Sequence, residues 1–490
     1  MTKSVQQPVG PAVDTTPASP PGPVTLTGRF GAVVRLNAAR AAAPLWRVFG
    51  GDDEIWTYIS GHGPFADEKA FTTWLEGRES QGDPYYYAVH DLNGRTLGLL
   101  ALMHIRPAMR VVEIGSIVYS AELQGTPLGT ETQYLLARYA FETLGYRRYE
   151  WKCDTLNASS RRAALRYGFV FEGIFRQHMI TKGHSRDTAY FSMLDGEWPA
   201  RKRNFERRLQ ADNFDRAGRQ KISLAALNNA KPDDAAGFSQ SAAGAAVPDM
   251  RISTTSVGEP HPVTGQPIGL PVDSTPAPRP GPVTLKGRYG RLEKLRPDHW
   301  PDLWDAFGGH DEVWTYISTD GPFSEASDFA AFIARRAAAE DPYAYAIVDA
   351  DDRAVGYVTL LRINPQMRVI EVGHVLYSPG LQRTVLGTET QYLLARYVFE
   401  ALGYRRYEWK CNALNAPSRR AALRYGFIYE GTFRQYMIAK GRNRDDAWFS
   451  MLEGEWPARK RNFECWLEPG NFDEKGAQKI SLAALNATAE

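Results

Sequence analysis

One turn occurs twice in the sequence, each time directly before an amphipathic helical pattern. Its residue types could bind a phosphate, because a glycine-bearing turn at a helix start leaves backbone N–H groups unpaired at the positive end of the helix dipole. A glycine turn before a helix is also typical of a simple structural cap, so both interpretations stay open. The two copies are Gln124-Gly125-Thr126-Pro127-Leu128-Gly129-Thr130 and Gln382-Arg383-Thr384-Val385-Leu386-Gly387-Thr388.

The two turns belong to a duplicated segment of the 490-residue chain. From Trp46 and Trp304 onward the halves align at a constant offset of 258 residues, and 38 of the 45 residues from Gly129 to Gly173 are identical in the second copy. This period indicates a duplicated domain, because solenoid repeats have periods of about 20–50 residues. We predict domains over residues 24–228 and 283–490, a flexible N-terminal tail over 1–23 and a flexible linker over 229–282.

Hydrophobic periodicity places the turn within an α+β domain. After the first turn, Leu135, Leu136, Tyr139 and Leu144 recur at helical spacing, and Gly145 is placed to end that helix. The order β-αα-βββ-αβ-αββ predicts a fold organised round one sheet. Expected strands cover 24–36, 85–105 as a hairpin around Asn93-Gly94, 109–120, 147–153, 169–180 and 188–195, and further helices cover 37–50, 67–78 and 159–168.

The strand expected over 147–153 alternates two kinds of side chain. This alternation indicates one charged face and one apolar face, because successive strand residues point to opposite sides of a sheet. The charged residues are Arg148, Glu150 and Lys152, and the apolar ones are Tyr149, Trp151 and Cys153.

Composition narrows the classes of partner. Lys+Arg 58 against Asp+Glu 56 gives a formal net charge of +2, so no global field favours nucleic acid or an anionic membrane. No run approaches the ~18 apolar residues of a membrane span, and the three cysteines form no disulfide framework, which suits a reducing compartment. His104, His178 and His184 have no regular ligand spacing, so we expect no metal. We therefore expect a cytoplasmic protein whose partners include neither nucleic acid nor membrane.

A longer motif carries more information than the turn alone. After the first turn come a strand and then the string LNASSRRAALRYGF, which contains Asn157 and Ser160 and recurs with one change around Asn415. Together with the turn, this string resembles the GNAT superfamily of acetyl-CoA-dependent N-acetyltransferases, and within it the RimJ/RimL-like branch. The pyrophosphate motif of that superfamily is Gln/Arg-x-x-Gly-x-Gly/Ala. Both copies depart from it at the central glycine, where Pro127 and Val385 stand.

The resemblance implies a fold and a coenzyme site. It implies two GNAT-type domains, each a central mixed, mostly antiparallel sheet flanked by helices, that take acetyl-CoA as the acyl donor. The pyrophosphate would lie on the turn amides, and the pantetheine arm would pair with the preceding strand in a gap splayed open beside it. The implied coenzyme-binding residues are Val118, Gln124, Gly125, Thr126, Leu128, Gly129, Thr130 and Asn157, with Leu376, Gln382, Arg383, Thr384, Leu386, Gly387, Thr388 and Asn415 in the second copy.

The resemblance also implies catalytic groups. Glu113 and Glu371 are implied as the base that deprotonates the amine, while a strand carboxylate can equally be solvated or paired in the core. Ser160 and Ser418 are implied as the acid that protonates the leaving thiolate, and the same residues fit a helix N-cap. Four aromatic residues either line the acceptor pocket or belong to the core: Trp56, Tyr58, Trp314 and Tyr316.

These features together predict an acetyl-CoA-dependent N-acetyltransferase. The acetyl group would pass to a primary amine by direct attack in a ternary complex, and the amine would be a protein N-terminus or a small molecule. The two domains are expected to form an intramolecular pseudo-dimer. The alternative is a catalytically impaired protein that keeps the fold and binds coenzyme or amine without turnover.

Overall fold

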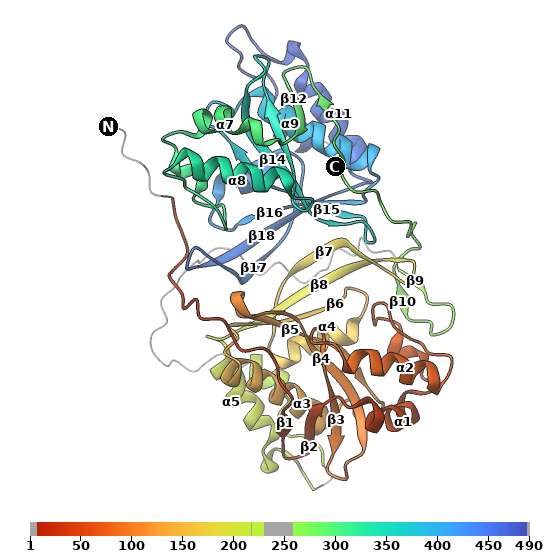
Figure 1. Cartoon of the computed structure of the whole chain (residues 1–490). Coiled ribbons are helices and arrows are strands. Elements are labelled where there is room, and N and C mark those ends of the chain that lie inside the picture. The colour runs from red at the N-terminus through yellow and green to blue at the C-terminus, as the bar shows by residue number, and fades with distance from the viewer. Residues whose placement is uncertain (1–6, 217, 230–257, 488–490) are drawn as a thin grey trace. The chain divides into compact units, whose positions relative to one another are not determined.

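The computed structural model describes residues 7–216, 218–229 and 258–487. It divides into two compact units, whose elements are labelled in Figure 1. The first-repeat unit comprises Thr15–Ile174 and His184–Val272. The second-repeat unit comprises Met1–Asp14, Phe175–Gly183 and Asp273–Glu490.

The elements of the first repeat follow the expected order, with two added helices at the end. The strands are β1 (Thr25–Thr27), β2 (Gly31–Arg35), β3 (Tyr85–Asp91), β4 (Thr96–Arg106), β5 (Val111–Tyr119), β6 (Arg148–Asp154), β7 (Val170–Thr181) and β8 (His184–Leu194). The helices are α1 (Ala38–Phe49), α2 (Glu68–Glu79), α3 (Pro127–Arg138), α4 (Ala158–Tyr167), α5 (Trp198–Leu209) and α6 (Leu224–Asn229).

The second repeat gives the same succession after a short hairpin, β9 (Glu259–Pro260) and β10 (Pro267–Ile268). Its strands are β11 (Leu285–Lys286), β12 (Arg291–Lys294), β13 (Tyr343–Val348), β14 (Ala354–Asn364), β15 (Val369–Tyr377), β16 (Arg406–Asn412), β17 (Ile428–Ala439) and β18 (Arg442–Leu452). Its helices are α7 (Trp300–Phe307), α8 (Ala326–Ala338), α9 (Val385–Arg396), α10 (Ala416–Arg424), α11 (Trp456–Leu467) and α12 (Leu482–Ala487).

The sheet of each repeat is mixed and mostly antiparallel, as predicted. In the first repeat β1 to β5 pair in sequence order and are antiparallel, β5 pairs with β6 in parallel, and β6 pairs with β8 in antiparallel fashion. In the second repeat β15 and β16 form the corresponding parallel pair. The predicted α+β fold class is confirmed.

The parallel pair opens part-way along its length. Pairing between β5 and β6 runs from Val111 opposite Arg148 to Ile114 opposite Trp151 and then stops. Two residues beyond, Ser116 has a positive φ of 48° in the middle of β5, a conformation that bends a strand. The second half of β5 therefore has a backbone edge that β6 does not cover. In the second repeat the pairing ends in the same way after Val372 and Trp409.

Apolar clusters cover the two faces of the sheet and hold this opening in place. In the first repeat, Leu135 of α3 and Tyr149 of β6 belong to one cluster, while Phe71 of α2 and Leu99 of β4 belong to the other. The helix that follows the glycine turn is thus packed on one face, and the helices near the N-terminus are packed on the other.

The expected single strand over 24–36 is a hairpin made of β1 and β2. Its turn is fixed from outside, because the buried carboxylate of Glu131 in α3 accepts the backbone N–H groups of Arg29 and Phe30 at 2.6 and 2.7 Å. Gly28 is required beside it, since a Cβ there would lie 2.2 Å from the same carboxyl group.

The predicted domain boundaries stay predictions. Residues 1–6 of the predicted tail and 230–257 of the predicted linker lie outside the described residues. No helix within the described ranges combines the length and the apolar character that crossing a membrane requires.

Candidate active site

The repeated glycine turn forms the N-terminus of α3. Thr126 is the N-cap: its hydroxyl oxygen accepts the N–H of Gly129 at 3.1 Å and donates to the carbonyl of Leu123 at 2.7 Å. In the described part of the chain the N–H groups of Gly125 and Leu128 have no hydrogen-bond partner. Two amide donors at the positive end of α3 are therefore available to an anion.

Each position in the turn has a local physical reason. Gly125 has φ +74°, and Arg383 adopts nearly the same value, +63°, in the second copy. Gly129 is needed for packing, because a Cβ would lie 2.8 Å from the carbonyl of Leu123. Pro127 is the first residue of α3, where no N–H is required by the helix. The departure from the superfamily motif therefore removes one donor without distorting the helix.

The predicted glutamine does not point into the turn. The side-chain amide of Gln124 donates to the carbonyl of Tyr119 at 2.9 Å, and Gln382 bonds Tyr377 in the same way at 3.1 Å. Both side chains hold the chain where it leaves the strand. Just before the chain leaves the strand, Val118 in β5 and Leu376 in β15 lie on the part of each strand that is not paired with β6 or β16.

Asn157 and Ser160 lie at the start of α4. The side-chain oxygen of Asn157 caps the helix by accepting the N–H of Ser160 at 2.9 Å. The hydroxyl of Ser160 accepts the indole N–H of Trp151 in β6 at 3.0 Å. Asn415 and Ser418 repeat both bonds in the second copy. The N-cap interpretation therefore holds for the two asparagines, whereas Ser160 and Ser418 lie inside α4 and α10 and are not the capping residues.

Glu113 lies in a buried ionic cluster. Its carboxylate contacts Lys152 Nζ at 2.7 Å and His104 Nδ1 at 2.6 Å, and the His104 side chain is 58% exposed. Burial would raise the pKa of Glu113, but Lys152 and His104 outweigh burial and hold the pKa below its ordinary value. Glu113 is therefore an ionised carboxylate that reaches solvent through an imidazole.

The charged face predicted for β6 exists, and it is buried. Arg148 is fully buried and pairs with Glu150 at 2.8 Å and with Glu172 at 2.7 Å. Lys152 also contacts Glu150 at 3.2 Å. Burial opposes the charge of Lys152, but Glu113 and Glu150 raise its pKa above the ordinary lysine value. These ion pairs fix the position of Glu113 in the first repeat.

The second repeat differs at the same place. Arg362 stands where the first repeat has His104, and it contacts the carboxylate of Glu371 directly. Lys410 lies 3.7 Å from Asp446, which replaces Thr188 of the first copy. Burial and the nearby Arg362 together lower the pKa of Lys410 to about 8, because Asp446 offsets them only in part.

The structure does not bring all the predicted catalytic residues together. Glu113 lies on the charged face of β5 and β6, whereas Ser160 contacts Trp151 from the opposite face. Only a molecule inserted between the separated ends of β5 and β6 could meet both. Within the described ranges no cluster of three His, Cys, Asp or Glu side chains is placed to hold a metal ion.

His104 is a functional candidate that the sequence did not reveal, because its contact with Glu113 appears only in the structure. The contact depends on strand register, since β4 and β5 pair with Met103 opposite Glu113. Residue types alone carry no signal for this pairing. The replacement of His104 by Arg362 between otherwise similar copies is the one hint that the sequence offers.

Comparison with known proteins decides the family. Residues 34–170 and 291–428, more than half of the chain, match the family described as "Acetyltransferase (GNAT) domain". The chain belongs to the GNAT acetyltransferase family. The predicted family and the tandem duplication are thereby confirmed, because one GNAT domain falls in each repeat.

Three relatives illustrate the similarity of this GNAT protein. It is 31% identical over 110 residues to "Putative ribosomal N-acetyltransferase YdaF" of Bacillus subtilis, covering 22% of this chain and 60% of the relative. It is 31% identical over 85 residues to "Ribosomal-protein-serine acetyltransferase" of Escherichia coli, covering 17% and 47%. A crystal structure of a GCN5-related N-acetyltransferase from Brucella melitensis is 42% identical, with a TM-score of 0.43, and the match covers 44% of this chain and 98% of that one. The chain thus spans about half the length of the curated relatives that it matches.

Proposed function

We propose that this GNAT protein transfers an acetyl group from acetyl-CoA to a primary amine by direct attack in a ternary complex. The observation that carries the proposal is the separation of β5 from β6 after Ile114 and Trp151, directly before a helix start with available amides. Membership of the family supports the same reaction.

The residues present fit acetyl-CoA. The N–H groups of Gly125 and Leu128 suit a pyrophosphate at the start of α3. The uncovered edge of β5 near Val118 suits the amide groups of a pantetheine arm, because such an edge offers unpaired backbone donors and acceptors. When bound, acetyl-CoA supplies an activated acyl group as a thioester.

The first repeat has the better arrangement for moving a proton. An amine must lose a proton to become an acyl acceptor, and an imidazole in contact with a buried carboxylate is a suitable base. His104 would accept that proton on the nitrogen that faces away from Glu113, while the contact with Glu113 holds the ring in place. Ser160 would donate a hydrogen bond to the leaving thiolate and keep its proton, while the thiolate takes up the proton that the acceptor nitrogen releases as the amide forms.

The second repeat favours another role. Glu371 is engaged by Arg362, and no imidazole replaces His104 there. Without the imidazole–carboxylate pair of the first repeat, this copy would bind coenzyme or amine and turn it over slowly. We therefore propose that catalysis is concentrated in the first repeat.

The acceptor is a protein N-terminus or a small amine. Both curated relatives carry names that refer to ribosomal proteins, which supports the first. The second is argued from the acceptor pocket below.

The test measures thiol release from acetyl-CoA over a panel of primary amines, with Glu113→Gln and Glu371→Gln as matched variants. We expect Glu113→Gln to lower kcat by roughly 10²–10⁴-fold, because it removes the carboxylate that serves His104. Glu371→Gln should change kcat little, and calorimetry should give wild-type affinity for acetyl-CoA in both variants. Equal loss in the two variants would contradict a division of roles. Failure of the wild type to bind acetyl-CoA would remove the proposed function.

A further inference from the structure

A short segment outside both predicted domains is itself repeated. Residues 7–14 read Q-P-V-G-P-A-V-D, and residues 266–273 read Q-P-I-G-L-P-V-D. We call these segments strap 1 and strap 2. Strap 1 lies in the second-repeat unit, and nearly all of strap 2 lies in the first-repeat unit.

Strap 1 pairs with the tip of the β17–β18 hairpin. The N–H of Asn443 donates to the carbonyl of Pro11 at 2.9 Å, and the N–H of Val13 donates to the carbonyl of Gly441 at 3.1 Å. Arg442 also donates from its guanidinium to the carbonyl of Gly10 at 3.1 Å. The backbone edge of the hairpin tip is therefore occupied by the strap.

Strap 1 also contacts Tyr316, one of the aromatic residues expected either to line the acceptor pocket or to belong to the core. The hydroxyl of Tyr316 donates to the carbonyl of Pro8 at 2.8 Å. Gly10 has no room for a side chain, because a Cβ would lie 2.0 Å from the carbonyl oxygen of Asn443. The strap thus fits closely along both the hairpin tip and the tyrosine.

Strap 2 repeats two of these hydrogen bonds and the tight glycine contact in the first-repeat unit. The hydroxyl of Tyr58 donates to the carbonyl of Pro267 at 2.7 Å, and the N–H of Ser185 donates to the carbonyl of Leu270 at 2.8 Å. A Cβ on Gly269 would lie 1.7 Å from the carbonyl oxygen of Ser185. The agreement of two copies of different sequence indicates a built feature.

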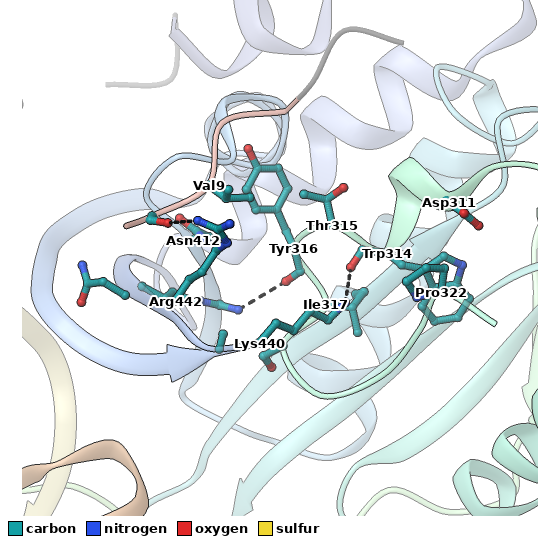
Figure 2. Close-up of a pocket in the computed structure, with 15 residues that line it drawn as sticks. Val9, Asp311, Trp314, Thr315, Tyr316, Ile317, Pro322, Asn412, Lys440 and Arg442 are labelled. Atoms are coloured by element: carbon teal, nitrogen blue, oxygen red, sulfur yellow. Dashed lines mark hydrogen bonds between the residues drawn. The ribbon is translucent and has the colours of Figure 1, made fainter. Parts of the chain in front are cut away.

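A pocket of about 340 Å³ lies beside strap 1 (Figure 2). Val9 and Gly10 of the strap form part of its wall, together with Trp314, Tyr316, Asn412 and Arg442. Asn412 is the last residue of β16, so the pocket lies at the separated end of the parallel pair. An acceptor for a thioester held between β15 and β16 would enter there.

We propose that strap 1 is a specificity-determining wall that restricts the pocket beside it to a small primary amine, and that strap 2, which makes equivalent contacts, does the same in the first repeat. The inference rests on the proposed function and deepens it. An extended peptide commonly binds by adding a strand to a free backbone edge, and here the strap takes that edge. The remaining volume is at the low end of the roughly 300–1,000 Å³ of ligand pockets, which accommodates a small amine.

The experiment uses the full chain and displaces both straps. The test variant carries Gly10→Ala and Gly269→Ala, and the matched control carries Gly22→Ala and Gly281→Ala, where a Cβ meets nothing closer than 3.8 Å. Amide hydrogen exchange at Val13, Asn443 and Ser185 reports whether the straps have moved. If exchange is unchanged, leucine replaces alanine at the same positions.

The readout is the ratio of kcat/KM for serine amide to that for a longer peptide that begins with serine. We expect the wild type and the control to favour serine amide by at least about tenfold, and the strap variant to lose most of that preference. Two results would overturn the inference. The first is a wild type that favours the peptide. The second is a variant whose straps are displaced but whose ratio of kcat/KM values equals that of the wild type.

Failure of the proposed function gives a different result. In that case the wild type releases no thiol with any amine, and the same two probes are compared by calorimetric binding. The inference would still be supported if the wild type binds serine amide but not the peptide, and the strap variant binds both. Binding of neither probe, or of both alike to the wild type, would refute it.

Discussion

At the residue scale, a few substitutions make two similar folds chemically unequal. Lys152 and Lys410 occupy the same position and are both buried, yet their pKa values move in opposite directions. The reason is the partner: Lys152 contacts two glutamates, whereas Lys410 has Asp446 at 3.7 Å and the cation Arg362 nearby. Burying a charge is costly unless an opposite charge compensates for it.

This difference predicts opposite effects of one mutation. Lys152→Met should lower the free energy of unfolding by about 3 kcal/mol, because Glu113 and Glu150 would be left without their shared cation. Lys410→Met should leave stability unchanged or raise it by up to about 3 kcal/mol at pH 7, because it removes a poorly compensated buried charge. Urea unfolding of both variants checks the prediction. A similar loss in the two would contradict it.

The sign of the pH dependence follows from the same shift. The folded protein releases the Lys410 proton at about pH 8, while the unfolded chain holds it up to the ordinary value of 10.5. Between these values the unfolded state binds more protons, so this lysine makes stability rise with pH in that window. In Lys410→Met, the rise in stability that this lysine contributes between about pH 8 and pH 10.5 should be absent.

At the element scale, the start of α3 is set by close packing as much as by ligand chemistry. Gly129 lets the first turn of α3 approach the carbonyl of Leu123, and Thr126 caps the helix from within. The packing of Gly129 and the Thr126 cap together position the backbone N–H groups of Gly125 and Leu128. A shift of the turn would move both donors together.

Gly129→Ala therefore tests the helix start as a coenzyme site. The new Cβ would meet the Leu123 carbonyl at 2.8 Å and displace the turn, so we expect acetyl-CoA affinity to fall about tenfold. Calorimetry measures the change. Gly77→Ala in α2 is the control, because a Cβ there meets nothing within 4 Å. Wild-type affinity in Gly129→Ala would mean that these amides do not bind the coenzyme.

At the scale of the whole molecule, both repeats build their sheet around buried ion pairs. Arg148 with Glu150 and Glu172 in the first repeat corresponds to Arg406 with Glu408 and Glu430 in the second. Burial would raise the pKa of Glu150 and of Glu430, but the neighbouring charges, Lys152 and Arg148 in one and Arg406 in the other, lower both values.

These depressed pKa values predict an acid-labile fold. The stabilisation from these ion pairs is complete above the ordinary glutamate pKa of 4.5. It is lost as pH falls below that value, because the glutamates are then protonated in the unfolded chain but still ionised in the folded one. Below pH 4.5, each such carboxylate should lower the free energy of unfolding by about 1.4 kcal/mol for every unit by which the pH falls. Denaturant unfolding between pH 7 and pH 3 measures this, and a flat profile would contradict it.

Much of the fold could be predicted from local pattern. The helical spacing around Leu135 and the alternation of Tyr149 with Glu150 appear in the structure as expected. The α-helix itself ends at Arg138 and continues as a π-helix over Tyr139–Thr143, and Gly145, with φ +79°, follows it. The hairpin of β1 and β2 could not be predicted, because a glutamate about 100 residues away in α3 fixes its turn. The pseudo-dimer and the cytoplasmic location stay predictions.

The duplication, the likeness to the GNAT superfamily and most helices and strands follow from residue order, periodicity and glycine positions, because these act locally. Which charges meet depends on the folded chain, since strand register places His104 against Glu113 and Arg362 against Glu371. The fold also decides what borders the pocket beside Tyr316, because strap 1 is remote in sequence from the hairpin that it covers. Long-range pairing is a property of the folded chain, and no local pattern encodes it.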